Sequence, residues 1–205
     1  MDYQTIATDE VISKAAQNLK ERGVDTIVVE NKEEALETIK KQIPSGASIM
    51  NGASITLEQI GFVDYLKSGA HPWSNLHERV LAEKDPAKQA QLRREATVSD
   101  YYLGSIHGLA TTGEFIVASN TGSQLPGIVF NSSNVIFVAG AQKIVPTLAD
   151  ALNRLNEYIV PLEDKHMQEL YGVNTSVSKI LIFNRENPMM GRKVSIILVK
   201  EKLGF

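Results

Sequence analysis

The sequence predicts an α/β protein with a mostly parallel, partly mixed sheet packed against helices. In the first third of the chain, short apolar runs rich in β-branched residues alternate with amphipathic helical segments, a pattern typical of parallel strands connected by helices. In the middle of the chain, apolar runs follow one another with only short polar turns between them, which indicates strands without intervening helices. Together the two observations predict a sheet that is mainly parallel but mixed in its middle part.

Helices and strands alternate over the first 66 residues. Thr8 can cap the first helix, Gly23 ends it, and the unbroken run at residues 26–29 is typical of a strand buried on both faces. Asn31 and Glu34 form a capping-box-like start for the second helix. The remaining elements expected here are a strand at residues 47–50 and a helix whose apolar face carries Ile60, Val63 and Leu66.

A charged, helix-favouring stretch occupies residues 76–98. Pro86 fits the first turn of a second helical segment after Asp85, because that position does not use the N–H that proline lacks. The apolar residues of this stretch need a covering surface, either their own domain or a second copy of the chain, and we expect a homo-oligomer. These residues are Leu81, Leu92 and Val98.

The second half of the chain adds more strands and one more capped helix. Thr147 and Asp150 form the capping pair of that helix. No linker, repeat or low-complexity segment interrupts the chain, so one domain is expected over residues 1–205. The strands are expected at residues 101–103, 115–118, 135–138, 179–183 and 194–199.

The composition argues against several classes of function. The chain has 205 residues, 43% of them hydrophobic, no cysteine and a formal net charge of −3. Without cysteine it has no disulfide, thiolate-held iron–sulfur cluster or cysteine zinc site. Nucleic acid is not an expected partner because positive charge is not in excess, and no apolar run approaches the ~20 residues of a membrane span. We expect a cytoplasmic protein with no membrane partner and no metal.

The loop after the second strand is the first candidate binding site. Asn51, Gly52, Ser54 and Thr56 stand between a strand and a helix, where backbone N–H groups and hydroxyls can hold a phosphate or carboxylate. The alternative is that Ser54 or Thr56 only caps the helix, Thr56 forming a capping box with Gln59. Neither a dinucleotide-binding fingerprint nor a P-loop occurs in the chain, so no cofactor is predicted.

The loop-rich stretch from Gly104 to Gly127 is the second candidate. His107 can act as a general acid or base and Glu114 as a base or nucleophile; alternatively, both are local or exposed polar residues. Lys143 follows a buried strand and can neutralise an anion or form a Schiff base, unless it is simply solvated. The other ligand-binding candidates are Gly104, Ser105, Thr112, Gly113, Asn120, Thr121, Gly122, Ser123 and Gln124.

Four ordered segments carry a resemblance to a known family. They are residues 49–61 (IMNGASITLEQIG), 104–114 (GSIHGLATTGE), 122–126 (GSQLP) and 140–145 (GAQKIV). In this order they resemble the LUD-domain family, which includes lactate-utilization protein C, over nearly the whole chain. The resemblance implies a Rossmann-like three-layer fold of the NagB/RpiA/CoA transferase-like superfamily, which also contains ribose-5-phosphate isomerase and 5-formyltetrahydrofolate cyclo-ligase.

The resemblance implies two classes of function. The first is the cluster-free component of a bacterial system that oxidises L-lactate to pyruvate. Such a component binds a small anionic metabolite and leaves electron transfer to an iron–sulfur protein partner. The second is a stand-alone enzyme acting on a phosphorylated, CoA-linked or folate-type metabolite, with Glu114 or His107 as base and Lys143 or residues 52–56 holding the anion. No catalytic residue of the family is carried over to this sequence.

Overall fold

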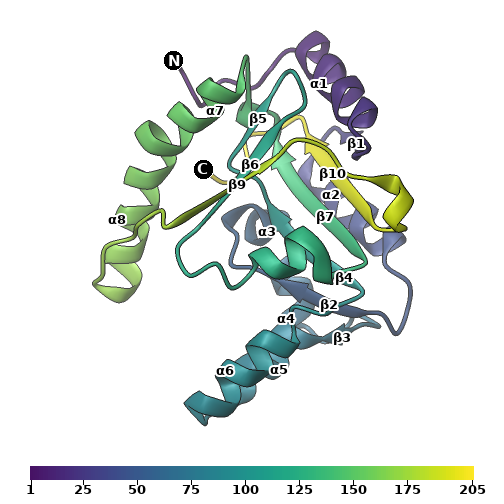
Figure 1. Cartoon of the computed structure of the whole chain (residues 1–205), viewed down its shortest axis with the longest axis vertical. Helices are drawn as coiled ribbons and strands as arrows, with labels where there is room; N and C mark the ends of the chain where they lie inside the picture. Colours follow the sequence, from purple (N-terminus) through teal and green to yellow (C-terminus); the bar gives the residue numbers. More distant parts are fainter.

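The computed structural model describes residues 1–205, the side chain of Pro188 excepted, and it contains two sheets (Figure 1). All strand pairs of the larger sheet are parallel, in the order β1-β10-β7-β4-β2-β3. Its strands are β1 (Asp25–Val29), β2 (Ser48–Asn51), β3 (Ser74–Asn75), β4 (Tyr101–Ser105), β7 (Asn134–Gly140) and β10 (Lys193–Val199). The predicted α/β fold class with a mainly parallel sheet is confirmed.

The antiparallel pairs lie in the smaller sheet, whose order is β8-β5-β6-β9. In this sheet β5 pairs with β8 in parallel, and β6 pairs antiparallel with both β5 and β9. Its strands are β5 (Gly108–Ala110), β6 (Phe115–Ser119), β8 (Ile144–Val145) and β9 (Lys179–Phe183). The mixed region expected from the closely spaced strands is therefore a separate layer.

The larger sheet buries apolar side chains on both faces. Along β7, Val135 and Phe137 face one core while Ile136 and Val138 face the other, as the two-residue period of a strand requires. One core is closed by α1 and the smaller sheet, and the other by α2, α3 and α4. These helices are α1 (Asp9–Glu21), α2 (Lys32–Gln42), α3 (Ile55–Gln59) and α4 (Phe62–Lys67).

The far face of the smaller sheet packs against a long helical segment (Figure 1). Asp150 and Thr147 form the predicted capping box at its start. Pro161 has no N–H to donate to a preceding carbonyl, and a wide π turn lies directly before it. The segment comprises α7 (Leu148–Arg154), the π-helix η3 (Leu155–Ile159) and α8 (Val160–Tyr171).

Two further helices, α5 (Leu76–Ala82) and α6 (Pro86–Glu95), project from the body of the molecule (Figure 1). Asp85 caps α6 by accepting hydrogen bonds from the N–H groups of Ala87 and Lys88, and Pro86 occupies its first turn as predicted. The remaining short elements are the π-helix η1 (Gly127–Asn131) and the 3-10 helices η2 (Ala141–Lys143) and η4 (Pro188–Met190). No helix within the described residues is both long enough and apolar enough to cross a membrane.

Two predictions about local structure are wrong. The strand at residues 26–29 is not buried on both faces, because β1 is an edge strand with β10 as its one neighbour; Ile27 and Val28 are 36% and 39% exposed. The single helix expected after residue 56 is two helices, α3 and α4. Gly61 separates them with a φ of +77°, a left-handed conformation that favours glycine.

Candidate functional site

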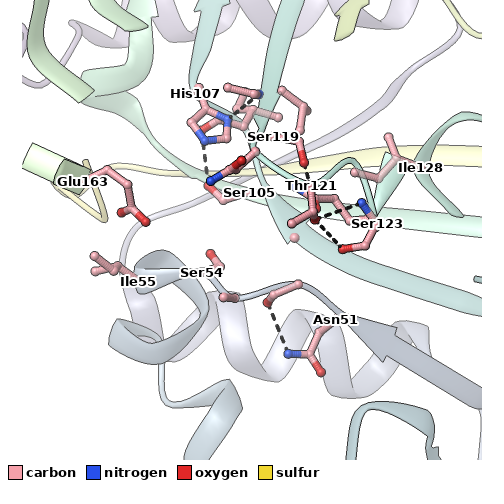
Figure 2. A pocket seen from close by; sticks show the side chains of 18 of the residues that line it. Asn51, Ser54, Ile55, Ser105, His107, Ser119, Thr121, Ser123, Ile128 and Glu163 are labelled. Carbon is pink, nitrogen blue, oxygen red and sulfur yellow. Dashed lines mark hydrogen bonds between the residues drawn. The ribbon is translucent and has the colours of Figure 1, made fainter. Parts of the chain in front are cut away.

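A cavity of about 480 Å³ opens at the carboxyl ends of β2 and β4 (Figure 2). This is the edge of an open parallel sheet at which ligands are commonly bound. The loop after β2, the turn between β4 and β5, and the loop after β6 contribute polar residues, whereas the η3–α8 segment contributes mainly apolar ones. The cavity therefore joins segments from both sheets.

Lys143 lies at the floor of this cavity and is only 4% exposed, so it is buried rather than solvated. Its Nζ donates to Ser105 Oγ at 3.0 Å, to Ile106 O at 3.1 Å and to Thr56 Oγ1 at 3.2 Å. Ser105 Oγ in turn donates to Val138 O at 2.7 Å. All three acceptors of Lys143 are neutral oxygens.

The chain itself fixes the position of Lys143. β7 ends at Gly140, and the 3-10 turn η2 carries the lysine from there to β8. Gln142, next to it, exchanges two hydrogen bonds with the backbone of Leu203, so residues 203–205 cross the floor. At Gly204, with φ +64°, a Cβ would collide with Thr56 Oγ1 and lie 3.1 Å from Lys143 Nζ; only glycine fits there.

The charge of Lys143 is poorly compensated. Burial, aided by the positive charge of Arg154, lowers the pKa of Lys143 from 10.5 to about 7. Arg154 is itself fully buried; its Nη1 donates to His107 O at 2.6 Å, while Nε and Nη2 are buried without a partner. Among the described side chains, neither cation takes part in an ion pair.

The loop between β2 and α3 forms another part of the cavity. Ser54 is the helix cap, accepting from the N–H of Leu57 at 3.3 Å, which agrees with one of the two alternatives for this loop. The capping box of Thr56 with Gln59 is wrong, because Thr56 points to Lys143 and Ser105 instead. The other two candidates of this loop, Asn51 and Gly52, also line the cavity.

His107 lines the cavity but is held in one protonation state. Its Nδ1 accepts a hydrogen bond from the N–H of Ala118 at 3.1 Å. Burial lowers the pKa of His107 to about 3, and the positive charges of Lys143 and Arg154 act in the same direction. The imidazole is therefore neutral near pH 7.

The loop after β6 is ordered by its own hydroxyls. Ser119 Oγ accepts from the N–H of Gly122 at 2.8 Å and donates to Gln124 Oε1 at 3.2 Å, and the hydroxyls of Thr121 and Ser123 lie 3.0 Å apart. Figure 2 shows Ser119, Thr121 and Ser123 across the cavity from Glu163 and Ile55. The predicted residues that line the cavity are Asn51, Gly52, Ser54, Thr56, Gly104, Ser105, His107, Asn120, Thr121, Ser123, Gln124 and Lys143.

Gly122, Thr112, Gly113 and Glu114 are not among the residues that line the cavity. Glu114 pairs with Arg22 of α1 at 2.6 Å and also accepts a hydrogen bond from Thr112. Burial raises the pKa of Glu114, but the hydrogen bonds from Thr112 and Arg22 outweigh burial, so the pKa is lowered. The structure thus separates Glu114 from His107, the two residues considered together as bases.

Sequence reasoning missed Glu163 and Arg93, two charged residues that line the cavity; His77 also lines it, although its spacing from His71 does not indicate a metal site. Glu163 is half-buried on α8, and burial raises the pKa of its carboxyl group. Burial lowers the pKa of His77, whose Nδ1 has no partner. All three lie on helices outside the polar loops, so no loop motif could identify them. Within the described residues, no cluster of His, Asp or Glu is arranged to hold a metal ion.

Comparison with known proteins agrees with this architecture. A crystal structure of a DUF162 family protein from Deinococcus radiodurans superposes with a TM-score of 0.57 at 12% identity, covering 95% of this chain and 99% of that chain, a likeness of fold. No curated protein matches the sequence. A family model described as LUD domain matches residues 12–185, which include Lys143 and its three oxygen contacts. The chain therefore belongs to the LUD domain family, as its four sequence segments predict.

Proposed function

We propose that this LUD-domain protein binds an organic anion in the cavity through Lys143. One observation carries the proposal: a buried ammonium group faces three neutral oxygens and no carboxylate. A buried charge without a partner is costly in free energy, and the nearby Arg154 adds to the positive potential. An anion bound at Lys143 compensates the charge of the lysine and lowers the positive potential to which Arg154 contributes.

The hydroxyl groups around Lys143 supply the second half of such a site. Thr56 and Ser105 contact the lysine directly, and Ser54 lies on the adjoining loop (Figure 2). A carboxylate has two oxygens with several acceptor positions. It can accept a hydrogen bond from Thr56, whose hydroxyl only accepts in the bonds of this structure, while it approaches the ammonium. Charge-assisted bonds of this kind are about twice as strong as neutral ones.

We further propose that the protein is the cluster-free component of a bacterial lactate-utilization system in the cytoplasm. Its membership in the LUD domain family supports this role. Because the chain has no cysteine, an iron–sulfur protein partner carries the electrons. Self-association through the projecting α5–α6 pair and the turn after it is part of the proposal, since Leu81 of α5 and Val98, three residues beyond α6, are 55% and 67% exposed.

Calorimetric titration and thermal-shift measurements with lactate, pyruvate, other small carboxylates, sugar phosphates, CoA esters and folates test the anion site. Ligand at a hundred times its Kd stabilises by about 2.7 kcal/mol, which raises the Tm by several degrees for a chain of this size. Lys143→Met should abolish that response. Lys165→Met, the same change at an exposed position of α8, is the matched control and should retain it. An equal response in both variants contradicts the proposal.

A second candidate function is a stand-alone enzyme acting on a phosphorylated, CoA-linked or folate-type metabolite. It is favoured by the presence in one cavity of Lys143, whose pKa is about 7, and Glu163, whose pKa is raised by burial. A lysine with a pKa near 7 suits proton transfer at neutral pH. Proton NMR of each stabilising ligand with the protein distinguishes the candidates. Conversion of a ligand, lost in Lys143→Arg while binding persists, favours the enzyme; an unchanged spectrum favours the binding protein.

A further inference from the structure

The walls of the cavity differ in character from its floor. We infer that the anion bound at Lys143 carries a large apolar body, so that the ligand is an amphiphilic carboxylic acid rather than a three-carbon acid. The inference rests on the proposed anion site and specifies the class of ligand that the site takes. Two observations carry it: the size of the cavity, and the apolar side chains that form one wall.

The cavity is too large for a three-carbon acid alone. Its volume of about 480 Å³ lies within the range of ~300–1,000 Å³ typical of sites for ligands of drug size. Lactate and pyruvate have six heavy atoms each and fill roughly 180 Å³, little more than a third of that space, on the scale of ~30 Å³ per water molecule in the liquid. The remaining volume can hold a body of many more atoms.

One wall of the cavity is formed by apolar side chains of η3 and α8. Leu155, Ile159, Val160 and Met167 all line the cavity. Leu155 and Ile159 also belong to the core against the smaller sheet and Val160 packs on that core, whereas Met167 is half-buried and lies outside it. α8 contains no fully buried residue, although Val160 and Met167 are apolar. The apolar side chains at the α8 end of this wall are therefore free to bury the apolar part of a ligand.

The charges in the cavity orient such a ligand. Glu163 lies between Ile159 and Met167, four residues from each, and also lines the cavity. Figure 2 shows its carboxyl group directed into the cavity. A carboxylate close to Glu163 is repelled, whereas one close to Lys143 is attracted. The acidic head therefore binds at the floor, and the apolar body extends along α8 toward Ile55, which lines the cavity beside Glu163.

A series of straight-chain carboxylates from two to eight carbons, titrated calorimetrically into the full chain at pH 6, tests the inference. Affinity should rise about fourfold per added CH₂ group, the value for complete burial, until the wall is filled. The methyl esters of the same acids, which lack the charge, should bind far more weakly. Met167→Gln and Ile55→Gln should reduce the gain per CH₂. Leu170→Gln, on the same helix but outside the cavity, is the matched control and should leave it unchanged.

The outcomes separate this inference from the proposed function. If short and long acids bind equally and Lys143→Met abolishes both, the anion site stands and the apolar body is excluded. If affinity rises with chain length but Lys143→Met changes nothing, the cavity is apolar without an anion site, which overturns the proposed function and with it the orientation inferred here. If no acid of the series binds while a sugar phosphate, CoA ester or folate does, only the present inference is overturned; if none of these ligands binds, both are overturned.

Discussion

Two polar regions of this molecule look alike in sequence but differ in how their charges are balanced. At the turn of residues 112–114, Glu114 meets Arg22 at 2.6 Å, and the side chains of this pair are 19% and 30% exposed. At the cavity floor, Lys143 is 4% exposed and meets three neutral oxygens. The charge of Glu114 is neutralised by Arg22 and partly by water. The charge of Lys143 is compensated neither by an ion pair nor by solvent.

The difference teaches that charge balance, rather than polar composition, distinguishes a binding site from a structural turn. Ion pairs near the surface contribute little free energy and need no ligand. A buried cation without a counter-charge costs stability, and ligand binding is one way in which that cost is recovered. The comparison can be tested from both sides, by removing each charge and by changing the pH.

The largest expected effect is on the pH dependence of stability in Lys143→Met. The pKa of Lys143 is about 7 in the folded protein against 10.5 in the unfolded chain, so between these values the unfolded state binds more protons. Wild-type stability therefore rises as the pH increases from 7 toward 10, by at most about 5 kcal/mol for this difference in pKa. Lys143→Met should therefore be more stable than wild type near pH 7, and this difference in the free energy of unfolding should shrink as the pH rises toward 10. Urea denaturation at pH 7, 8 and 9 measures it; parallel curves for the two proteins would show that Lys143 is not destabilised in the fold.

The second effect is on ligand affinity. Because the anion requires the ammonium form of Lys143, the Kd of a bound carboxylate should rise up to about tenfold for each pH unit above 7. Lys143→Arg should bind the anion without this dependence, since arginine stays charged. Calorimetric titration from pH 6 to 9 gives the Kd values. A wild-type Kd that is constant over this range contradicts a role for the lysine.

A smaller effect is expected at the other region. Glu114→Gln removes the ion pair with Arg22 and should lower the free energy of unfolding by about 1 kcal/mol at pH 7, the upper value for partly exposed pairs. Because the pKa of Glu114 is lowered, this contribution is present above its unfolded-state value and is lost as the pH falls through the folded-state value. Denaturation of the double variant with Arg22→Met measures the coupling. The ligand response should not change, and its loss would place Glu114 in the site.

The smallest effect concerns Glu163. Burial raises the pKa of its carboxyl group, so the folded state binds the proton more tightly than the unfolded state does. Wild-type stability therefore falls as the pH rises from the unfolded-state pKa through the folded-state pKa. Glu163→Gln should therefore be more stable than wild type at pH 7, by less than about 1 kcal/mol because the group is only half-buried. At pH 4 the two should be equal. A variant less stable at pH 7 would indicate that the carboxylate is stabilised by a partner.

Local signals in the sequence predicted the starts of helices well. Thr8, Asn31, Asp85 and the Thr147–Asp150 pair all form the expected caps, because a cap depends only on residues two or three positions apart. The sequence did not reveal that β1 lies at an edge or that the antiparallel strands form their own sheet. Strand order depends on contacts between segments far apart in the chain, which periodicity does not encode.

In the candidate site, too, local features could be predicted from the sequence and contacts between distant segments could not. The polar loops and Lys143 could be selected from residue type and position after a strand, and the structure brings most of them into one cavity. The environment of Glu114 could not be predicted, because its partner Arg22 is 92 residues away. Glu163 was missed because it lies on α8, a helix that follows the π turn before Pro161 and that the apolar spacing of the sequence did not predict.

The floor lysine also joins the two sheets mechanically. Lys143 directly precedes β8 of the smaller sheet, and its Nζ binds Ser105 at the end of β4 in the larger one and Ile106 just beyond it. A ligand that draws the ammonium away from Ile106 O loosens one of the ties between the layers. Occupancy of the cavity would then be transmitted as a change in how firmly β5 and β8 are held, and amide hydrogen exchange in those two strands would report it without any assay of the ligand.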